Sequence, residues 1–223
     1  MSSAKGRILN LLGGLVLSEA ELSRVEVLGE RFVYLEVRGA PAKGYTPGAK
    51  VQIVFPSRDV RTYTPVGWDN GRFELLAFDH GGSTPATRWL KGLEAGQKIR
   101  FVGPSRSLSL PAGPITFIGD ETAIAVAAAF KRARPQGFET ILEVAPELDV
   151  APALEQLGLS DAQVFRRGAR TDPALLDAVA SGARVGMAGG GAMIKRVRGE
   201  LRARGVSDFK VKAYWVEGKS GLD

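Results

Sequence analysis

Hydrophobic and polar residues follow two different patterns along the chain, and the pattern changes near residue 110. Before that point, short β-rich runs are separated by glycine and proline. The predicted strands are 22–28, 31–37, 51–55, 61–64, 72–78 and 98–102. Six short strands at close spacing indicate an antiparallel six-stranded β-barrel or a sandwich, and we expect the barrel. One short helix is predicted over 87–93, after Pro85.

After residue 110, apolar strand-like runs alternate with helical runs. The predicted strands are 115–118, 140–144, 162–165, 184–188 and 209–215, and the predicted helices are 121–132, 152–157, 173–180 and 191–204. This alternation favours a parallel sheet with helices on its faces, as in α/β domains. The proline-containing stretch 105–113 is the expected junction, so we predict two domains, 1–110 and 111–223.

The first residues form a third kind of segment. Lys5 and Arg7 precede an apolar run, 8–17, whose large residues fall at helical spacing. The run is too short to span a bilayer, and no other run is a better candidate. We therefore expect a short amphipathic helix that docks on the body or on a second subunit, no integral membrane segment and a cytoplasmic protein.

Composition narrows the chemistry. The chain of 223 residues has no cysteine and a single histidine, His80. Disulfides, thiolate metal sites and iron–sulfur clusters are excluded, and a metal site built mainly from imidazoles is disfavoured. We therefore expect no metal site, so that any redox chemistry must depend on an organic cofactor.

The charge balance indicates an anionic partner. The formal net charge is +6 and the sequence pI is about 9.7. Aromatic residues are not interleaved with the basic ones, as they often are in proteins that bind single-stranded nucleic acid, and we expect no nucleic-acid partner.

The strongest local motif is Arg61-Thr62-Tyr63-Thr64, which follows the predicted strand 51–55. Arginine can hold a pyrophosphate through a bidentate fork. A tyrosine ring can stack on a flat heteroaromatic ring, and a threonine hydroxyl can hydrogen-bond to a ring nitrogen. An ordinary edge strand, in which threonine and tyrosine are favoured, is the alternative interpretation.

A second cluster runs from His80 to Thr87. Pro85, Ala86 and Thr87 open a helix, where free N–H groups and the helix dipole can bind an anion. The alternative is N-capping by Thr84 or Thr87. His80 stands next to two glycines, and a lone histidine of this kind is otherwise structural or exposed.

Two further turns fall at the carboxyl edge of the predicted parallel sheet, where open α/β sheets bind ligands. The first is Gly119-Asp120-Glu121-Thr122, in which Asp120 or Glu121 can instead cap the next helix. The second is Gly189-Gly190-Gly191, where missing side chains would let a ligand approach the backbone. Neither turn has the full Gly-x-Gly-x-x-Gly phosphate fingerprint.

Four segments together resemble the ferredoxin reductase superfamily and, within it, the siderophore-interacting proteins, which are flavin-dependent ferric-siderophore reductases. The segments span most of the chain in the family's order. They are 61–64, then His80-Gly81 with Pro85-Ala86-Thr87 and Trp89, then 119–123, and finally Tyr214-Trp215.

The resemblance implies FAD as the cofactor and NAD(P)H as the electron donor. It implies that Arg61 and Thr62 lie at the FAD site, with Arg61 at the phosphates. Tyr63 would lie against the isoalloxazine ring and Thr64 near its redox-active nitrogen. His80 would bond to FAD phosphate or ribose. Pro85, Ala86 and Thr87 would hold the pyrophosphate, although threonine stands at 84 where the family usually has glycine.

The second half would hold the nucleotide and the substrate. The resemblance implies that Asp120, Glu121 and Thr122, with Gly189 and Gly190, face the nicotinamide nucleotide, although the acidic residue common in the latter turn is missing. Lys210 and Lys212 would attract an anionic ferric siderophore, or else protect an edge strand from aggregation. Trp215, with Tyr214, would flank adenine or flavin, or pack in the core.

Arg166 and Arg167 end the third predicted strand of the α/β domain. An arginine there suits the 2′-phosphate of NADPH, and a solvated helix face is the alternative. The expected function is thus a FAD-dependent, NAD(P)H-using ferric-siderophore reductase. A general NAD(P)H:acceptor flavoprotein reductase and a non-catalytic basic ligand-binding protein are the rival interpretations. A ferredoxin is the alternative electron donor.

Overall fold

The computed structural model describes residues 17–40, 44–180 and 182–218, so the predicted N-terminal helix lies outside the described residues. The chain divides into two compact units, Met1–Ser107 and Leu108–Asp223. The first holds antiparallel strands and the second a parallel sheet with helices, so the predicted fold class is confirmed.

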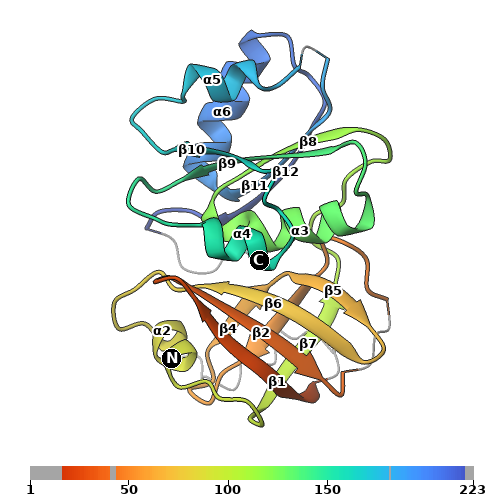
Figure 1. Cartoon of the computed structure of the whole chain (residues 1–223), viewed down its shortest axis with the longest axis vertical. Coiled ribbons are helices and arrows are strands. Elements are labelled where there is room, and N and C mark those ends of the chain that lie inside the picture. The colour runs from red at the N-terminus through yellow and green to blue at the C-terminus, as the bar shows by residue number, and fades with distance from the viewer. Residues whose placement is uncertain (1–16, 41–43, 181, 219–223) are drawn as a thin grey trace, which may run out of the picture. The chain divides into compact units, whose positions relative to one another are not determined.

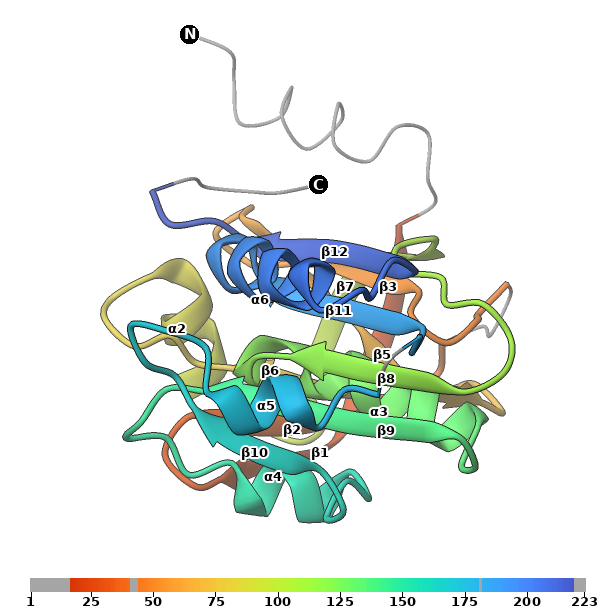
Figure 2. The ribbon, with the colours of Figure 1, turned by 90° about the horizontal axis from the view of Figure 1, so that it is seen from above.

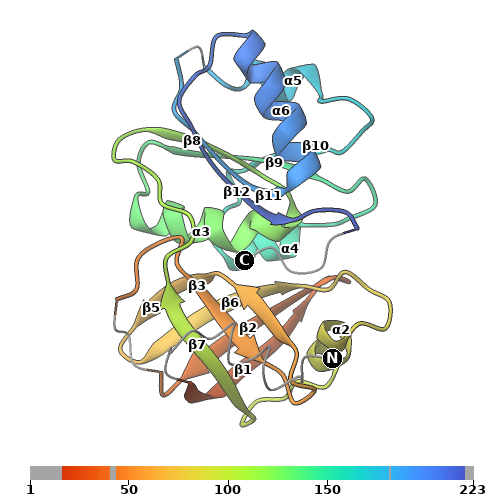
Figure 3. The ribbon, with the colours of Figure 1, turned by 180° about the vertical axis from the view of Figure 1, so that it is seen from behind.

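The first unit is one antiparallel sheet of seven strands in the order β4-β3-β7-β1-β2-β6-β5. Figures 1 and 3 show from opposite sides that this sheet curls around a common core. Its strands are β1 (Ser18–Leu28), β2 (Phe32–Arg38), β3 (Lys50–Val54), β4 (Val60–Tyr63), β5 (Pro65–Asp69), β6 (Arg72–Phe78) and β7 (Lys98–Ser105). Six correspond to predicted strands, and β5 is additional.

Strand β5 was missed because proline and glycine within Pro65–Asp69 were interpreted as turn residues. Its pairing with β6 is a hairpin, in which Trp68 lies opposite Phe73 and Asp69 opposite Arg72. The two residues between them, Asn70 and Gly71, have φ values of 48° and 74°. Two positive φ values are what a two-residue type I′ hairpin turn requires, so the sequence Asp-Asn-Gly was the available signal.

The two outermost strands of this sheet are consecutive in sequence. Only Thr64 separates β4 from β5, although they lie at opposite ends of the strand order. The sheet must therefore curl until its margins meet, and among the described residues no hydrogen-bonded ladder joins those margins. The enclosed core contains Leu35, Phe73 and Phe101, and the short helix α2 (Pro85–Lys91) packs on it through Leu90.

The second unit is a five-stranded parallel sheet in the order β10-β9-β8-β11-β12. Its strands are β8 (Ile115–Gly119), β9 (Phe138–Val144), β10 (Gln163–Arg166), β11 (Val185–Gly190) and β12 (Phe209–Trp215). The chain runs outward from β8 to β10, returns to β11 beside β8, and then runs outward to β12. The direction reverses between β8 and β11, and at such a switch point the strand ends leave a crevice.

Helices cover both faces of this sheet. Figures 1 and 2 show α5 and α6 on one face and α3 and α4 on the other. The helices are the 3-10 turn η1 (Glu121–Ala123), α3 (Ile124–Ala133), α4 (Ala151–Gln156), α5 (Pro173–Asp177) and α6 (Gly191–Ala203). Helix α3 is buried over its first seven residues, which explains its run of alanines and apolar side chains. The core below α5 and α6 includes Ile141, Met187 and Val197.

Within the described parts of the chain, no helix combines the length and apolar character needed to cross a membrane. Nor do the described residues contain a group of three or more His, Cys, Asp or Glu side chains placed to hold a metal ion.

Candidate functional site

The motif 61–64 lies at the margin of the antiparallel sheet. Arg61 and Tyr63 pair with Ile53 and Val51 of β3. Arg61 and Thr62 are exposed, Tyr63 is half-buried, and Thr64 is 8% exposed. The Arg61 guanidinium donates to the Val60 carbonyl at 2.8 Å. The strand therefore presents an exposed arginine and a partly exposed tyrosine, while the threonine that follows it is buried.

Tyr63 belongs to an aromatic cluster. Its ring centroid lies 6.3 Å from that of Trp89, and the Trp89 ring stacks on Phe55 at 4.5 Å. Burial of the Tyr63 hydroxyl raises its pKa well above the ordinary value, in spite of the Arg61 charge. The phenol therefore stays neutral at any physiological pH.

The loop before α2 is organised by Asp79, a residue that the sequence analysis did not select. Its Oδ1 accepts hydrogen bonds from the Gly81 N–H at 2.8 Å and from the Thr87 hydroxyl at 2.7 Å. Burial alone would raise the pKa of Asp79, but these two bonds and the Arg31 charge hold it below the ordinary value. In the sequence, only the spacing of Asp79, Gly81 and Thr87 could have indicated that Asp79 accepts these hydrogen bonds.

The start of α2 is already capped. The Thr87 N–H donates to the Thr84 hydroxyl at 3.2 Å, and the Arg88 N–H donates to the Thr84 carbonyl at 3.0 Å. Thr84 is thus the N-cap that the alternative interpretation named, and the Thr87 side chain is buried. Pro85 has no N–H, which leaves Ala86 to supply any free donor in this turn. His80 packs edge-on against Phe78, with ring centroids 4.9 Å apart.

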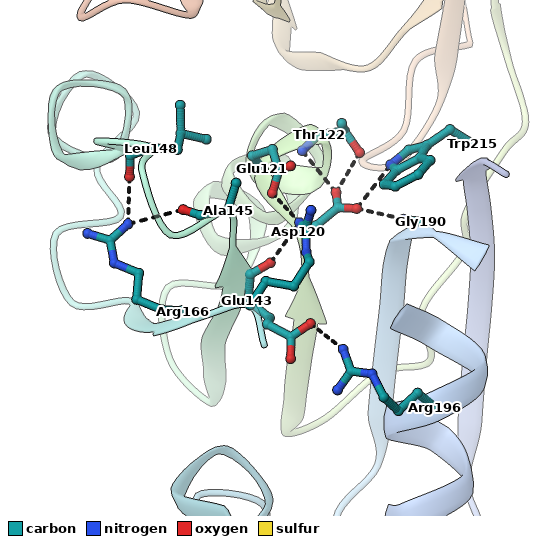
Figure 4. Close-up of polar contacts among 11 residues, drawn as sticks. Asp120, Glu121, Thr122, Glu143, Ala145, Leu148, Arg166, Gly190, Arg196 and Trp215 are labelled. Atoms are coloured by element: carbon teal, nitrogen blue, oxygen red, sulfur yellow. Dashed lines mark hydrogen bonds and ion pairs between the residues drawn. The ribbon is translucent and has the colours of Figure 1, made fainter. Parts of the chain in front are cut away.

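At the switch point of the second unit, one buried carboxylate joins three strands. Asp120 is fully buried. Its Oδ1 accepts from the Thr122 N–H at 2.9 Å and the Thr122 hydroxyl at 2.6 Å, and its Oδ2 accepts from the Gly190 N–H at 2.6 Å and Trp215 Nε1 at 3.0 Å (Figure 4). We call these four residues the Asp120 network. It fixes the ends of β8, β11 and β12 together.

The glycine turn after β11 is filled by this network. A Cβ at Gly189 would lie 2.5 Å from Asp120, and a Cβ at Gly190 would lie 2.6 Å from Trp215. Gly189 also has φ of 122°, which disfavours any side chain. The space that side chains at Gly189 and Gly190 would take is therefore occupied by Asp120 and Trp215, and it is not open to a ligand.

Arg166, the last residue of β10, and Arg167, the next one, have different surroundings. Figure 4 shows the Arg166 guanidinium directed toward the Ala145 and Leu148 carbonyls. Arg167 forms a 2.5 Å ion pair with Glu121. Burial, and then the Asp120 charge, raise the pKa of Glu121 above the ordinary value although Arg167 opposes this. Arg166 is exposed, and one of its nitrogens, Nη1, donates to the Leu148 carbonyl at 2.6 Å. The positive charge of Arg167 is therefore balanced by the Glu121 carboxylate, whereas no carboxylate pairs with Arg166 among the described residues.

Sequence reasoning missed a third buried acid in this unit, besides Asp120 and Glu121. Glu143 is fully buried and accepts from Arg196 of α6 at 2.5 Å (Figure 4). Arg196 also donates to the Thr171 hydroxyl at 2.5 Å, and Thr171 donates to Glu200 at 2.8 Å. These contacts tie the loop before α5 to α6. Strand β9 contains two glutamates, and Glu143, which stands between Leu142 and Val144, was the sequence signal for this network.

Strand β12 is the margin of the parallel sheet beside β11. Lys210 is exposed and Lys212 half-buried. The two side chains lie on the same face of the strand because they are two residues apart. On the other face, Arg198 and Arg202 of α6 lie 5.5 Å and 5.9 Å from the ring centroid of Phe209. Tyr214 and Trp215 are both half-buried.

The two candidate regions differ in how they suit their expected ligands. The 61–64 strand offers an exposed guanidinium and a partly exposed neutral ring, which fit an anionic group joined to a flat heteroaromatic one. In the 119–122 and 189–191 turns, the Asp120 carboxylate already takes the N–H groups of Thr122 and Gly190. Those N–H groups therefore do not fit a dinucleotide phosphate.

No protein-family model and no curated protein matches the chain, but solved structures do. A siderophore utilization protein from T. fusca is 21% identical with a TM-score of 0.71, and the match covers 94% of this chain and 96% of that chain. The siderophore-interacting protein from Acinetobacter baumannii is 18% identical with a TM-score of 0.70, covering 92% and 93% of the two chains.

A third solved structure is the FAD/NAD-binding domain of nitric oxide dioxygenase from Vibrio cholerae. It is 14% identical with a TM-score of 0.65, and the match covers 89% of this chain and 98% of that domain. The chain therefore has the fold shared by siderophore-interacting proteins and FAD/NAD-binding domains, over almost its whole length.

Proposed function

We propose that the chain is a FAD-dependent reductase that uses NAD(P)H to reduce ferric siderophores in the cytoplasm. The observation that carries the proposal is Arg61-Thr62-Tyr63-Thr64 on strand β4, with Arg61 exposed and Tyr63 half-exposed. The similarity to two proteins whose names refer to siderophores supports it, because both are matched over almost their full length.

On the flavin side, the environments of Arg61 and Tyr63 support the roles proposed for them. Arg61 binds the pyrophosphate as a bidentate donor, and the neutral Tyr63 ring stacks on the isoalloxazine. Thr62 is an exposed neighbour, and Thr64 directs its hydroxyl to the ring nitrogen. His80, Ala86 and the loop that Asp79 holds complete the site beside α2. When bound, FAD accepts hydride from reduced nicotinamide and passes electrons singly to Fe(III).

On the nucleotide side, the contribution of the chain is mainly positional. Glu121, Thr122 and Trp215 border the carboxyl edge where the nucleotide is proposed to lie. Asp120, Gly189 and Gly190 shape that edge from within. Arg166 keeps its charge and is the candidate for the 2′-phosphate of NADPH. Lys210 and Lys212 are the proposed attraction for an anionic ferric siderophore.

The direct test is a visible absorption spectrum of the purified protein, repeated after FAD is added and the protein desalted. Bound-flavin bands are expected in the wild type and are expected to be much weaker in Tyr63→Ala and Arg61→Ala. Anaerobic bleaching by NADPH or NADH, followed by reoxidation with a ferric siderophore, then tests turnover. If no flavin stays bound after reconstitution, the proposal fails and the basic ligand-binding alternative takes its place.

The nucleotide preference has its own test. Arg166→Ala is expected to lower kcat/KM for NADPH about 10-fold or more and to leave that for NADH almost unchanged, because one charged phosphate contact is lost. Arg167→Ala is the matched comparison, since Arg167 is already paired with Glu121. If Arg166→Ala does not change the NADPH/NADH ratio of kcat/KM, the role proposed for Arg166 is wrong.

A general NAD(P)H:acceptor flavoprotein reductase is the second candidate. It is favoured by the likeness to a FAD/NAD-binding domain whose parent protein is a nitric oxide dioxygenase. The two candidates separate when ferric siderophores and ferricyanide are compared as acceptors for the reduced protein. Faster reduction of the siderophores supports the first, and equal or slower reduction supports the second. A reduced ferredoxin tested in place of NAD(P)H examines the alternative donor.

A further inference from the structure

Trp89 contacts two aromatic side chains, Phe55 just after β3 and Tyr63 in β4. The Phe55 ring stacks on it, with centroids 4.5 Å apart and planes 23° from parallel. The Tyr63 ring is tilted against it, with centroids 6.3 Å apart and planes at 39°. Phe55 follows β3 and is buried, while Tyr63 and Trp89 are half-buried. Trp89 therefore links the buried Phe55 ring to the half-buried Tyr63 ring.

Helix α2 holds Trp89 firmly at this place. Leu90, the next residue, is buried in the core of the antiparallel sheet. Thr87, two residues earlier, is 2% exposed and donates to Asp79 at 2.7 Å. The Asp79 backbone is in turn bonded to Arg31 at the start of β2, through an N–H···O contact of 2.7 Å. Trp89 thus sits on a helix that is fixed at two neighbouring residues.

Tyr63, by contrast, is on a strand that has few restraints of its own. Strand β4 pairs with β3 on one side only and is the outermost strand of the sheet. A side chain on such a strand holds one rotamer only where packing restricts it. Tyr63 and Trp89 both pack against the apolar core of this sheet, and Trp89 is the aromatic ring next to Tyr63. The stacked Phe55 ring in turn restricts the plane of Trp89.

We propose that Trp89 is a positioning residue that fixes the plane of the Tyr63 ring, and through it the flavin ring that Tyr63 stacks on. The proposal rests on the FAD site proposed above and adds a residue to which that site gives no role. Trp89 is expected to act through Tyr63, so its loss should change the geometry and electronic environment of the flavin in molecules that still carry FAD.

The test compares Trp89→Leu, Trp89→Phe and the control Trp68→Phe, all fully loaded with FAD. Trp68 packs against Phe73 in the core of the same sheet, at 4.3 Å, and has no contact with Tyr63 among its ring partners. In Trp89→Leu we expect flavin fluorescence to rise at least twofold, the visible circular dichroism of the flavin to weaken, and kcat to fall more than KM changes. Trp89→Phe should recover most of the wild-type signals. Trp68→Phe should lower the Tm without changing the flavin fluorescence or the visible circular dichroism.

If Trp89→Leu lowers the Tm but leaves the flavin fluorescence yield and visible circular dichroism unchanged, the inference is wrong and the proposed function stands. If the wild type retains no flavin, both fail together. Should Trp89→Leu not fold, Phe55→Leu removes the ring behind Trp89 and is expected to produce the same flavin changes at smaller size. Unchanged signals in a folded Phe55→Leu protein would equally overturn the inference.

Discussion

Two adjacent glycines, Gly189 and Gly190, allow two other side chains to pack at the carboxyl edge of the parallel sheet. Gly189 leaves room for the Asp120 carboxylate, and Gly190 leaves room for the Trp215 indole. Since Asp120 bonds to both Gly190 and Trp215, the two spaces are filled by one hydrogen-bonded group. A side chain at either position must displace a buried partner.

Gly190→Ala is expected to destabilise the protein by about 1–3 kcal/mol, because the added methyl overlaps the Trp215 ring and the structure must shift. The displaced indole should also show red-shifted fluorescence. Gly199→Ala is the matched control, since Gly199 lies within α6 and nothing is within 4 Å of its added Cβ. It should stabilise by about 0.5–1 kcal/mol. Urea unfolding of both variants checks this, and equal stability changes would contradict it.

Some of the residue-level arrangement was predictable and some was not. Residues two apart in a strand lie on the same face, so the shared face of Lys210 and Lys212 follows from the prediction of β12 alone. The partners of Asp120 were not predictable: Gly190 and Trp215 are 70 and 95 residues away, and only the strand order brings them together. Glu143 and Arg196, 53 residues apart, were missed for the same reason.

Helix α2 depends on a small number of polar contacts for its position. It has seven residues, too few to be stable by itself, and it carries Trp89. The Thr84 cap fixes its first turn, and the bond from Thr87 to Asp79 joins it to the end of β6. Loss of the second contact should therefore affect the whole helix.

Thr87→Val keeps the shape of the side chain and removes the hydroxyl that Asp79 accepts. We expect a loss of about 1–3 kcal/mol at pH 7, because a half-buried carboxylate loses a hydrogen bond. The pKa of Asp79 is lowered in the folded protein, so its stabilisation is complete above the ordinary carboxyl pKa and is lost as the pH falls through the lowered one.

The difference in unfolding free energy between wild type and Thr87→Val should therefore shrink as the pH falls from 6 to 3. Urea titrations at several pH values measure it. Thr87→Ser retains the hydroxyl and should follow the wild type. A difference that stays constant with pH would mean that the Thr87 hydroxyl does not interact with the Asp79 charge.

Element types were predicted better than element limits. All five parallel strands were predicted: β8, β9 and β11 are largely apolar runs, whereas β10 and β12 are short runs with apolar residues among charged ones. The predicted helix 121–132 is in fact a 3-10 turn followed by α3, because Asp120 caps the turn through Thr122. Such a cap is a local contact that hydrophobic periodicity does not report.

Net charge is unevenly divided over the molecule. The first unit has fifteen basic and ten acidic residues, whereas the second has fifteen and fourteen. The excess positive charge therefore belongs almost entirely to the antiparallel unit, which carries the proposed site for the anionic FAD. This agrees with the expectation of an anionic partner, but the scattered basic residues of the second half are largely balanced by acids.

Each unit has its own core, so hydrogen exchange should reveal two protected centres. The slowest amides are expected in β1 and β2 of the first unit and in β8 and β11 of the second, because these strands are paired on both sides. The outermost strands β4, β5, β10 and β12 should exchange faster. Native-state exchange followed by mass spectrometry measures this, and β12 amides as slow as those of β8 would contradict it.

The one-residue link at Thr64 determines where the antiparallel unit tolerates a break. A nick in the Asn70-Gly71 turn would leave β5 and β6 joined by their ladder. A nick at Thr64 would separate two strands that no ladder connects among the described residues, so side-chain packing alone would hold the seam closed. A circular permutant that opens the chain at residue 70 should therefore keep the curvature of the sheet through its ladders, whereas one that opens at residue 64 would depend on core packing alone to keep the two margins together.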